Sequence, residues 1–133
     1  TGSAYACYRP MSSDTYSTDS PLFIVAGGST ATDINQPVSA ITTSNRFEYS
    51  ILGSSTNAFV TGSNIPVSLY FPSMEISYLQ RKAYLFGGAP EINLPVNTVY
   101  SLDLSNPGGN PWNLETKTMP KSRFGHKAII LNR

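Results

Sequence analysis

The sequence is poor in the residues on which most catalytic and metal sites depend. It contains one cysteine and one histidine among 133 residues, Cys7 and His126. A single cysteine excludes an internal disulfide, and a single histidine excludes a site built from several histidines. The eight acidic residues form no spaced motif. We therefore expect no catalytic residue, metal ligand or cofactor within this segment.

Charge is scarce as well. Charged residues make up 13% of the chain, against about 25% in typical domains, and the net charge is +1. This balance indicates neither nucleic acid nor an acidic membrane surface as a partner. No apolar run is long enough to span a membrane, and no stretch keeps a helical period. Low charge with abundant serine and threonine leans toward a secreted or cell-surface setting, without assigning a compartment.

Two apolar runs that each end in two adjacent glycines stand out instead. They are Pro21 to Gly28 (PLFIVAGG) and Lys82 to Gly88 (KAYLFGG). Successive side chains of a strand point to opposite faces, and both faces of these runs are apolar, which predicts strands covered on both sides. Adjacent glycines at the end of a strand permit positive φ or a close approach of another backbone.

The two runs begin units with the same order of features. When Gly28 is aligned with Gly88, a tyrosine, an aromatic residue and a hydrophobe-proline pair follow in both units. A period of roughly 40–60 residues with four strands per unit is the signature of propeller blades. The corresponding positions are Tyr49 and Tyr100, Phe59 and Trp112, Ile65-Pro66 and Met119-Pro120.

These motifs resemble kelch repeats over nearly the whole chain. The second unit is the closer match, with Gly87, Gly88, Tyr100, Trp112 and the stretch 123–126 (Arg-Phe-Gly-His). The first unit has Gly27 and Gly28 but carries phenylalanine in place of the tryptophan, and it lacks the Arg-x-Gly-His stretch. The resemblance implies an all-β, kelch-type β-propeller and a role in binding proteins or ligands. A minority of the family are enzymes.

The repeat predicts about two four-stranded antiparallel blades. We place the first blade at about 3–61, the second at about 74–117 and the start of a third at 124–133. A closed ring needs about 4–8 blades, so we expect the segment to belong to a longer polypeptide or a larger assembly. The remaining blades, from the same chain or from other chains, would then be its first partners. We expect strands at 3–8, 21–26, 46–52, 57–61, 74–80, 82–86, 98–104, 112–117 and 126–131.

Arg123 is the leading candidate for ligand binding, with Arg46 and Glu91 as weaker companions. The resemblance implies that an arginine in the stretch around 123 lines the ligand-facing mouth of the propeller. A guanidinium presents a fixed fork of donors that suits carboxylates. The alternative is a surface or inter-blade contact. The long connection 29–45 and the loop 89–95 are expected to emerge on the same face.

Three functions remain open at this point. The first is a non-catalytic interaction module with a protein or ligand partner. The second is a structural propeller piece of an extracellular or filamentous assembly. The third is part of a galactose-oxidase-like or carbohydrate-active enzyme whose catalytic residues lie outside this segment. A fold alone cannot choose among them.

Overall fold

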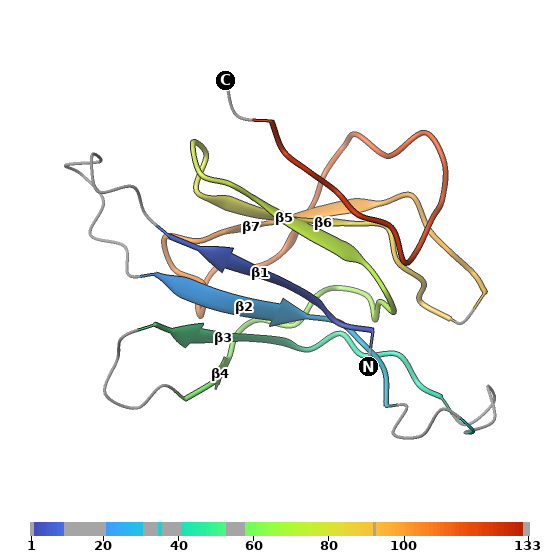
Figure 1. Ribbon diagram of the computed structural model, residues 1–133, viewed down its shortest axis with the longest axis horizontal. Helices are drawn as coiled ribbons and strands as arrows, with labels where there is room; N and C mark the ends of the chain where they lie inside the picture. The colour runs from blue at the N-terminus through green and yellow to red at the C-terminus, as the bar shows by residue number, and fades with distance from the viewer. Residues whose placement is uncertain are drawn as a thin grey trace.

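The computed structural model describes residues 2–9, 21–30, 35, 41–52, 58–91 and 93–131. These residues form eight β-strands and no helix, arranged as two four-stranded antiparallel sheets (Figure 1). This confirms the expected all-β class with two four-stranded antiparallel sheets. Sheet 1 consists of β1 (Ala4–Tyr8), β2 (Leu22–Ala26), β3 (Phe47–Ile51) and β4 (Val60–Thr61). Sheet 2 consists of β5 (Ser73–Ser77), β6 (Lys82–Phe86), β7 (Val99–Asp103) and β8 (Asn113–Leu114).

Eight of the nine expected strands form, and in both sheets neighbouring strands follow chain order. The outer strands β4 and β8 are shorter than expected, with two residues each. The strand expected at 126–131 does not form, because no other described strand pairs with it. Much of the expected connection 29–45 lies outside the described residues, as do residues 10–20 and 53–57.

The double glycines end β2 and β6 in the same way. All four glycines have positive φ. The amide of Gly28 donates to the carbonyl of Leu69 at 2.7 Å, and the amide of Gly88 donates to the carbonyl of Arg123 at 2.9 Å. A Cβ on the first glycine of either pair would lie 2.5 Å from that same carbonyl oxygen. Glycine is therefore needed because the returning backbone passes where a side chain would begin.

The loops repeat as closely as the strands do. The side-chain amide of Asn45 donates to the carbonyl of Ile65 at 3.2 Å, and that of Asn97 donates to the carbonyl of Met119 at 3.1 Å. The amides of Ile65 and Met119 each donate back to the asparagine carbonyl at 2.9 Å. In both units the asparagine lies two residues before the third strand, which is the sequence signal for this contact.

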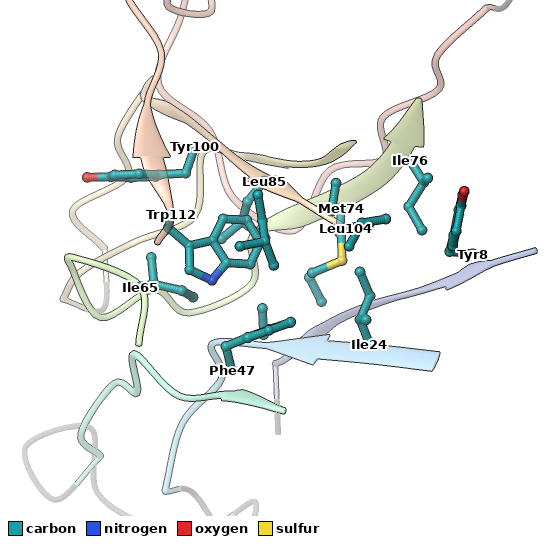
Figure 2. Close-up of a cluster of buried hydrophobic side chains, with 14 of the residues drawn as sticks. Tyr8, Ile24, Phe47, Ile65, Met74, Ile76, Leu85, Tyr100, Leu104 and Trp112 are labelled. Carbon is teal, nitrogen blue, oxygen red and sulfur yellow. The ribbon is translucent and has the colours of Figure 1, made fainter. Parts of the chain in front are cut away.

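The two sheets face each other across the hydrophobic core. Of the described strands, β1 and β5 bring the sheets closest together, and the buried face of β1 carries Ala4, Ala6 and the ring of Tyr8. Farther from β1 and β5, the space between the sheets is filled by large side chains, including Phe47 and Trp112 (Figure 2). The rings of these two residues meet edge to face, with centroids 5.4 Å apart.

The strand register corrects one step of the sequence alignment. In sheet 1, Tyr49 lies opposite Ile24. Ile24 is four residues before Gly28 in the sequence. The corresponding residue of sheet 2, four residues before Gly88, is Tyr84, and it lies opposite Ser101. Tyr49 therefore corresponds to Ser101 and not to Tyr100. A one-residue slip changes the face of the sheet, and sequence spacing alone did not resolve it.

The two sheets bury opposite faces of their corresponding strands. In β2 the buried face carries Ile24, whereas in β6 the buried face carries Leu85, which corresponds to Val25. The two sheets therefore meet through different faces. If sheet 1 were superimposed on sheet 2, the face that sheet 1 buries would coincide with the face that sheet 2 leaves open. Such a head-to-tail contact can continue in both directions. The sequence predicts that β2 and β6 are covered on both faces, but each strand is fully covered on one face only. On the faces turned away from the shared core, Phe23 and Tyr84 are half-buried.

Candidate interaction surface

Loops of both sheets meet at the end where the double glycines lie. The hydroxyl of Thr43 donates to the carbonyl of Pro90 at 2.5 Å and so joins the two units. The amide of Tyr70 donates to the carbonyl of Ala89 at 2.8 Å, and the amide of Ala89 donates back at 2.9 Å. The described parts of the connections 29–45 and 89–95 therefore share one surface, as the repeat predicts.

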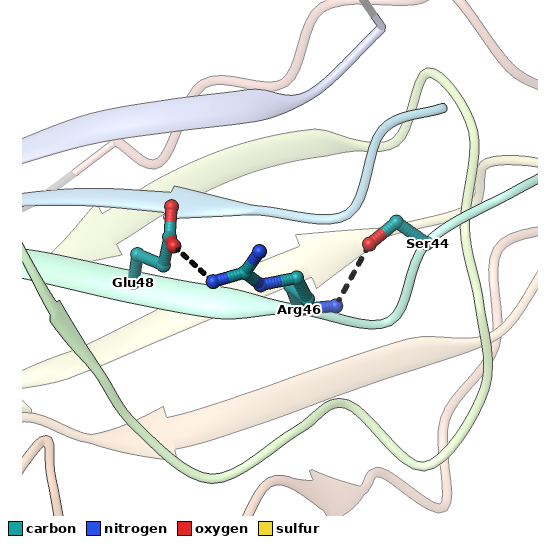
Figure 3. Close-up of polar contacts among 3 residues, drawn as sticks. All are labelled: Ser44, Arg46 and Glu48. Atoms are coloured by element: carbon teal, nitrogen blue, oxygen red, sulfur yellow. Dashed lines mark hydrogen bonds and ion pairs between the residues drawn. The ribbon is translucent and has the colours of Figure 1, made fainter. Parts of the chain in front are cut away.

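Arg46 lies just before β3 and already has an acidic partner. Its guanidinium donates to the carboxylate of Glu48 at 2.7 Å, and its backbone amide donates to the hydroxyl of Ser44 at 3.2 Å (Figure 3). The side chain of Arg46 is 64% exposed, so the ion pair contributes little to stability, at most about 1 kcal/mol. It nevertheless neutralises one of the two candidate arginines.

The backbone of Arg123 is held by two hydrogen bonds, whereas its side chain is exposed. Its carbonyl accepts from Gly88, and its amide donates to the carbonyl of Val96 at 3.2 Å. Its side chain lies in the most one-sided stretch of charge in the chain, since residues 116–131 contain four cationic and no acidic side chains. All four are exposed, and they are Lys117, Lys121, Arg123 and Lys127.

Glu91 is exposed and begins a tight turn, in which the amide of Leu94 donates to its carbonyl at 3.0 Å. The structure does not join the three predicted residues into one cluster. Among the described residues, no hydrogen bond or ion pair connects Arg46, Glu91 and Arg123 with one another. The three predicted residues are therefore not assembled into one contact network.

His126 follows Gly125, and its surroundings disfavour the protonated imidazole. Neither ring nitrogen has a hydrogen-bonding partner among the described residues. Burial lowers the pKa of His126 below its ordinary value of 6.5, and the positive charge of Arg123 lowers this pKa further. Protonation would leave a buried charge without an acceptor, so the folded chain favours the neutral imidazole.

This pKa shift predicts a pH dependence of stability. Because the folded pKa is below the unfolded one, the unfolded chain binds the proton first as the pH falls. The contribution of His126 to the free energy of unfolding should be fully present well above pH 6.5 and should be lost as the pH falls through and below 6.5. Urea unfolding across this range should show a smaller fall for His126→Gln. The pKa of Asp103 is lowered from 3.8, chiefly by a hydrogen bond from Ser105, so its effect belongs to more acidic solution. Equal pH profiles for both chains would contradict the assignment.

A groove lies over the open face of sheet 2, the face turned away from sheet 1, and its lining residues are not among the predicted site residues. The groove encloses about 720 Å³ and has Tyr84, Phe86 and Val99 on its floor. Met119 and Ile130 line it as well. The available signal was the apolar second face of the KAYLFGG strand, which we had expected to be covered.

The open face of sheet 1, also turned away from the core, carries a row of aromatic rings. Phe23 lies between Tyr5, with ring centroids 6.2 Å apart, and Phe59, with centroids 5.9 Å apart. Tyr5 is 66% exposed and Phe59 is 53% exposed. Both sheets thus present apolar side chains on the faces that they do not share.

The comparisons with known proteins add no family to these observations. No model of a known protein family matches the chain, and no curated protein sequence matches it significantly. Across the described part of the chain, no group of three or more His, Cys, Asp or Glu side chains could hold a metal ion. The same part contains no helix that is long and apolar enough to cross a membrane.

Proposed function

We propose that the chain forms two blades of a kelch-type β-propeller and acts as a non-catalytic interaction module. The head-to-tail packing of the two sheets carries the proposal. Blades of a propeller pack the same pair of opposite faces at every contact and lie closest at their innermost strands. The close approach of β1 and β5 fits that geometry.

The double-glycine end is the proposed recognition surface, and an acidic segment of a protein is the proposed ligand. Loops at one end of a rigid scaffold are where binding residues concentrate. The exposed cations between 116 and 131 have no acidic neighbour in that stretch, so they attract carboxylates. Arg123 is central to this proposal because Arg46 is already paired with Glu48.

Binding of a fluorescein-labelled glutamate-rich peptide tests the proposal. We expect saturable binding at low salt, measured by fluorescence anisotropy, and no binding of a glutamine-rich peptide of equal length. Arg123→Gln should weaken binding about three- to tenfold, because one exposed ion pair is worth on the order of 1 kcal/mol.

Arg46→Gln is the matched control. It removes the same charge from a guanidinium that already has a carboxylate partner. We expect less than about a twofold change in affinity for this variant. Equal losses in both variants would indicate only nonspecific attraction to net charge, and the absence of binding would refute the acidic-ligand assignment.

A further inference from the structure

The open face of sheet 1 becomes polar toward the double-glycine end, where the corresponding face of sheet 2 is apolar. The strand registers align Glu48 with Tyr100, because Glu48 lies opposite Val25 and Tyr100 lies opposite Leu85. Tyr100 and Leu85 belong to the core between the sheets, whereas Glu48 is a half-buried carboxylate on the open face. A position that is aromatic and buried in one sheet thus carries a charge in the other.

Three neighbouring positions differ in the same direction. They are aligned by the double glycines, by matched backbone hydrogen bonds to the second glycine, and by the starts of β3 and β7. In each pair the residue of sheet 1 is the more polar one. The pairs are Ser29 and Ala89, Ser44 and Val96, and Arg46 and Thr98. The backbone therefore repeats at this end but the side chains do not, which indicates a role for sheet 1 beyond the contact that sheet 2 makes here.

These side chains line a pocket, which we call the polar pocket. It encloses about 260 Å³. That volume lies just below the range of roughly 300–1,000 Å³ that is typical for drug-sized ligands, so it suits one small ring. Val25 provides an apolar floor, and Tyr5 lies opposite Val25 on the same face. The polar side chains of the lining are Ser3, Ser29, Thr30, Ser44, Arg46 and Glu48.

Hydrogen bonds within the chain hold several of these polar groups in place. The hydroxyl of Ser3 donates to a backbone carbonyl at 3.1 Å, and the hydroxyl of Thr30 accepts from the amide of Thr42 at 3.1 Å. The guanidinium of Arg46 donates to the carboxylate of Glu48 at 2.7 Å, along one face of β3 (Figure 3). Side chains that are ordered before a ligand arrives lower the entropy cost of binding.

The ion pair determines which ligand suits the polar pocket. A guanidinium carries several N–H donors and a carboxylate carries several acceptor positions, and the mutual contact of Arg46 and Glu48 uses one of each. The two charges cancel, so the pair favours neither an anion nor a cation. Adjacent hydroxyl groups of a sugar both donate and accept hydrogen bonds, which matches donors and acceptors that lie side by side.

We propose that the polar pocket binds one ring of a neutral sugar. Arg46 and Glu48 hydrogen-bond to adjacent hydroxyl groups of the ring, and the C–H groups of the ring lie against Val25. The sugar site is independent of the acidic ligand proposed for Arg123, because the two ligands differ in charge and contact different arginines.

Titration of the full chain with methyl glycosides tests the sugar site. The probes are methyl β-D-glucopyranoside, methyl β-D-galactopyranoside and methyl α-D-mannopyranoside, and amide chemical shifts in NMR spectra report binding. With one or more of these probes we expect saturable shifts at residues 44–48 and a dissociation constant on the order of 1–10 mM. The fully O-methylated form of the same sugar has no hydroxyl donors and should not bind.

Two glutamates provide a matched pair of variants. Glu48→Gln keeps the size of the side chain but removes the charge of the acceptor, and it should weaken sugar binding about three- to tenfold. Glu91→Gln removes the same charge from an exposed side chain outside the polar pocket and should change affinity less than about twofold. Neither glutamate belongs to the hydrophobic core, so both variants should fold.

The two arginines separate the sugar site from the acidic-ligand site. Arg46→Gln should weaken sugar binding about three- to tenfold and leave binding of the glutamate-rich peptide within about twofold. Arg123→Gln should have the reverse effects. Loss of peptide binding with retained sugar binding would refute only the acidic ligand.

Three results would overturn the sugar site. The first is the absence of saturable shifts with all of the methyl glycosides up to about 100 mM. The second is equal binding of the O-methylated sugar, which would mean that the hydroxyl groups are not recognised. The third is equal weakening by Glu48→Gln and Glu91→Gln, which would place binding outside the polar pocket.

Discussion

Gly87→Ala should destabilise the folded chain by about 3 kcal/mol or more. Two costs add at this position. Gly87 has a φ of 59°, a region that costs a residue with a side chain roughly 1–2 kcal/mol. Its Cβ would also lie 2.5 Å from the carbonyl oxygen of Arg123. That oxygen cannot easily retreat, because it accepts from Gly88, and the amide of Arg123 is held by Val96.

Gly125→Ala separates these two costs. Gly125 has a φ of 65°, but no atom lies within 4 Å of a Cβ built there. We therefore expect a loss of only about 1–2 kcal/mol. Urea unfolding of both variants, followed by circular dichroism, measures the difference in free energy of unfolding. Equal losses would mean that the close backbone approach at Gly87 does not constrain the fold.

Trp112→Ala should cost about 3–5 kcal/mol of stability. Trp112 is 4% exposed and packs edge to face on Phe47 of the opposite sheet, with centroids 5.4 Å apart. Its indole nitrogen has no hydrogen-bonding partner among the described residues, so the loss would come from packing and not from a polar contact. Large-to-small changes in a core leave a cavity that the surroundings fill only partly.

Phe59→Ala is the matched control, because Phe59 occupies the corresponding position of sheet 1. Val60 lies opposite Tyr49, and Asn113 lies opposite Ser101, which aligns Phe59 with Trp112. Phe59 is 53% exposed and contacts Phe23 on the open face. We expect a loss below about 1 kcal/mol, again measured by urea unfolding. A loss as large as that of Trp112→Ala would mean that this face is covered in solution.

The contrast between Trp112 and Phe59 shows how position within the assembly determines the role of a residue. Both side chains project from the same face of their own sheets. In sheet 2 that face packs against sheet 1, and in sheet 1 it is open. If both sheets buried the same face, truncation at the two positions would cost similar free energies of unfolding. Because the sheets pack head to tail, we expect a large difference between the two variants.

Local patterns in the sequence determined the strands, their order and the double-glycine turns. Alternating apolar residues and adjacent glycines act within a few residues, so the eight strands of the structure were predictable from short segments. The candidate arginines were also visible in the sequence, but their difference was not. The ion pair of Arg46 with Glu48 depends on side-chain geometry in β3, and Arg123 has no described acidic neighbour of this kind.

Only the tertiary structure decided which face of each strand is buried, and therefore which residues form the core and which lie on the open faces. The register of β7 placed Tyr100 one residue away from the position suggested by spacing, and that shift changes the face on which a side chain lies. The unpaired segment 126–131 has the alternation of a strand, yet it forms none among the described residues. The physical reason is that a strand is completed by a neighbour, and no local pattern supplies that neighbour.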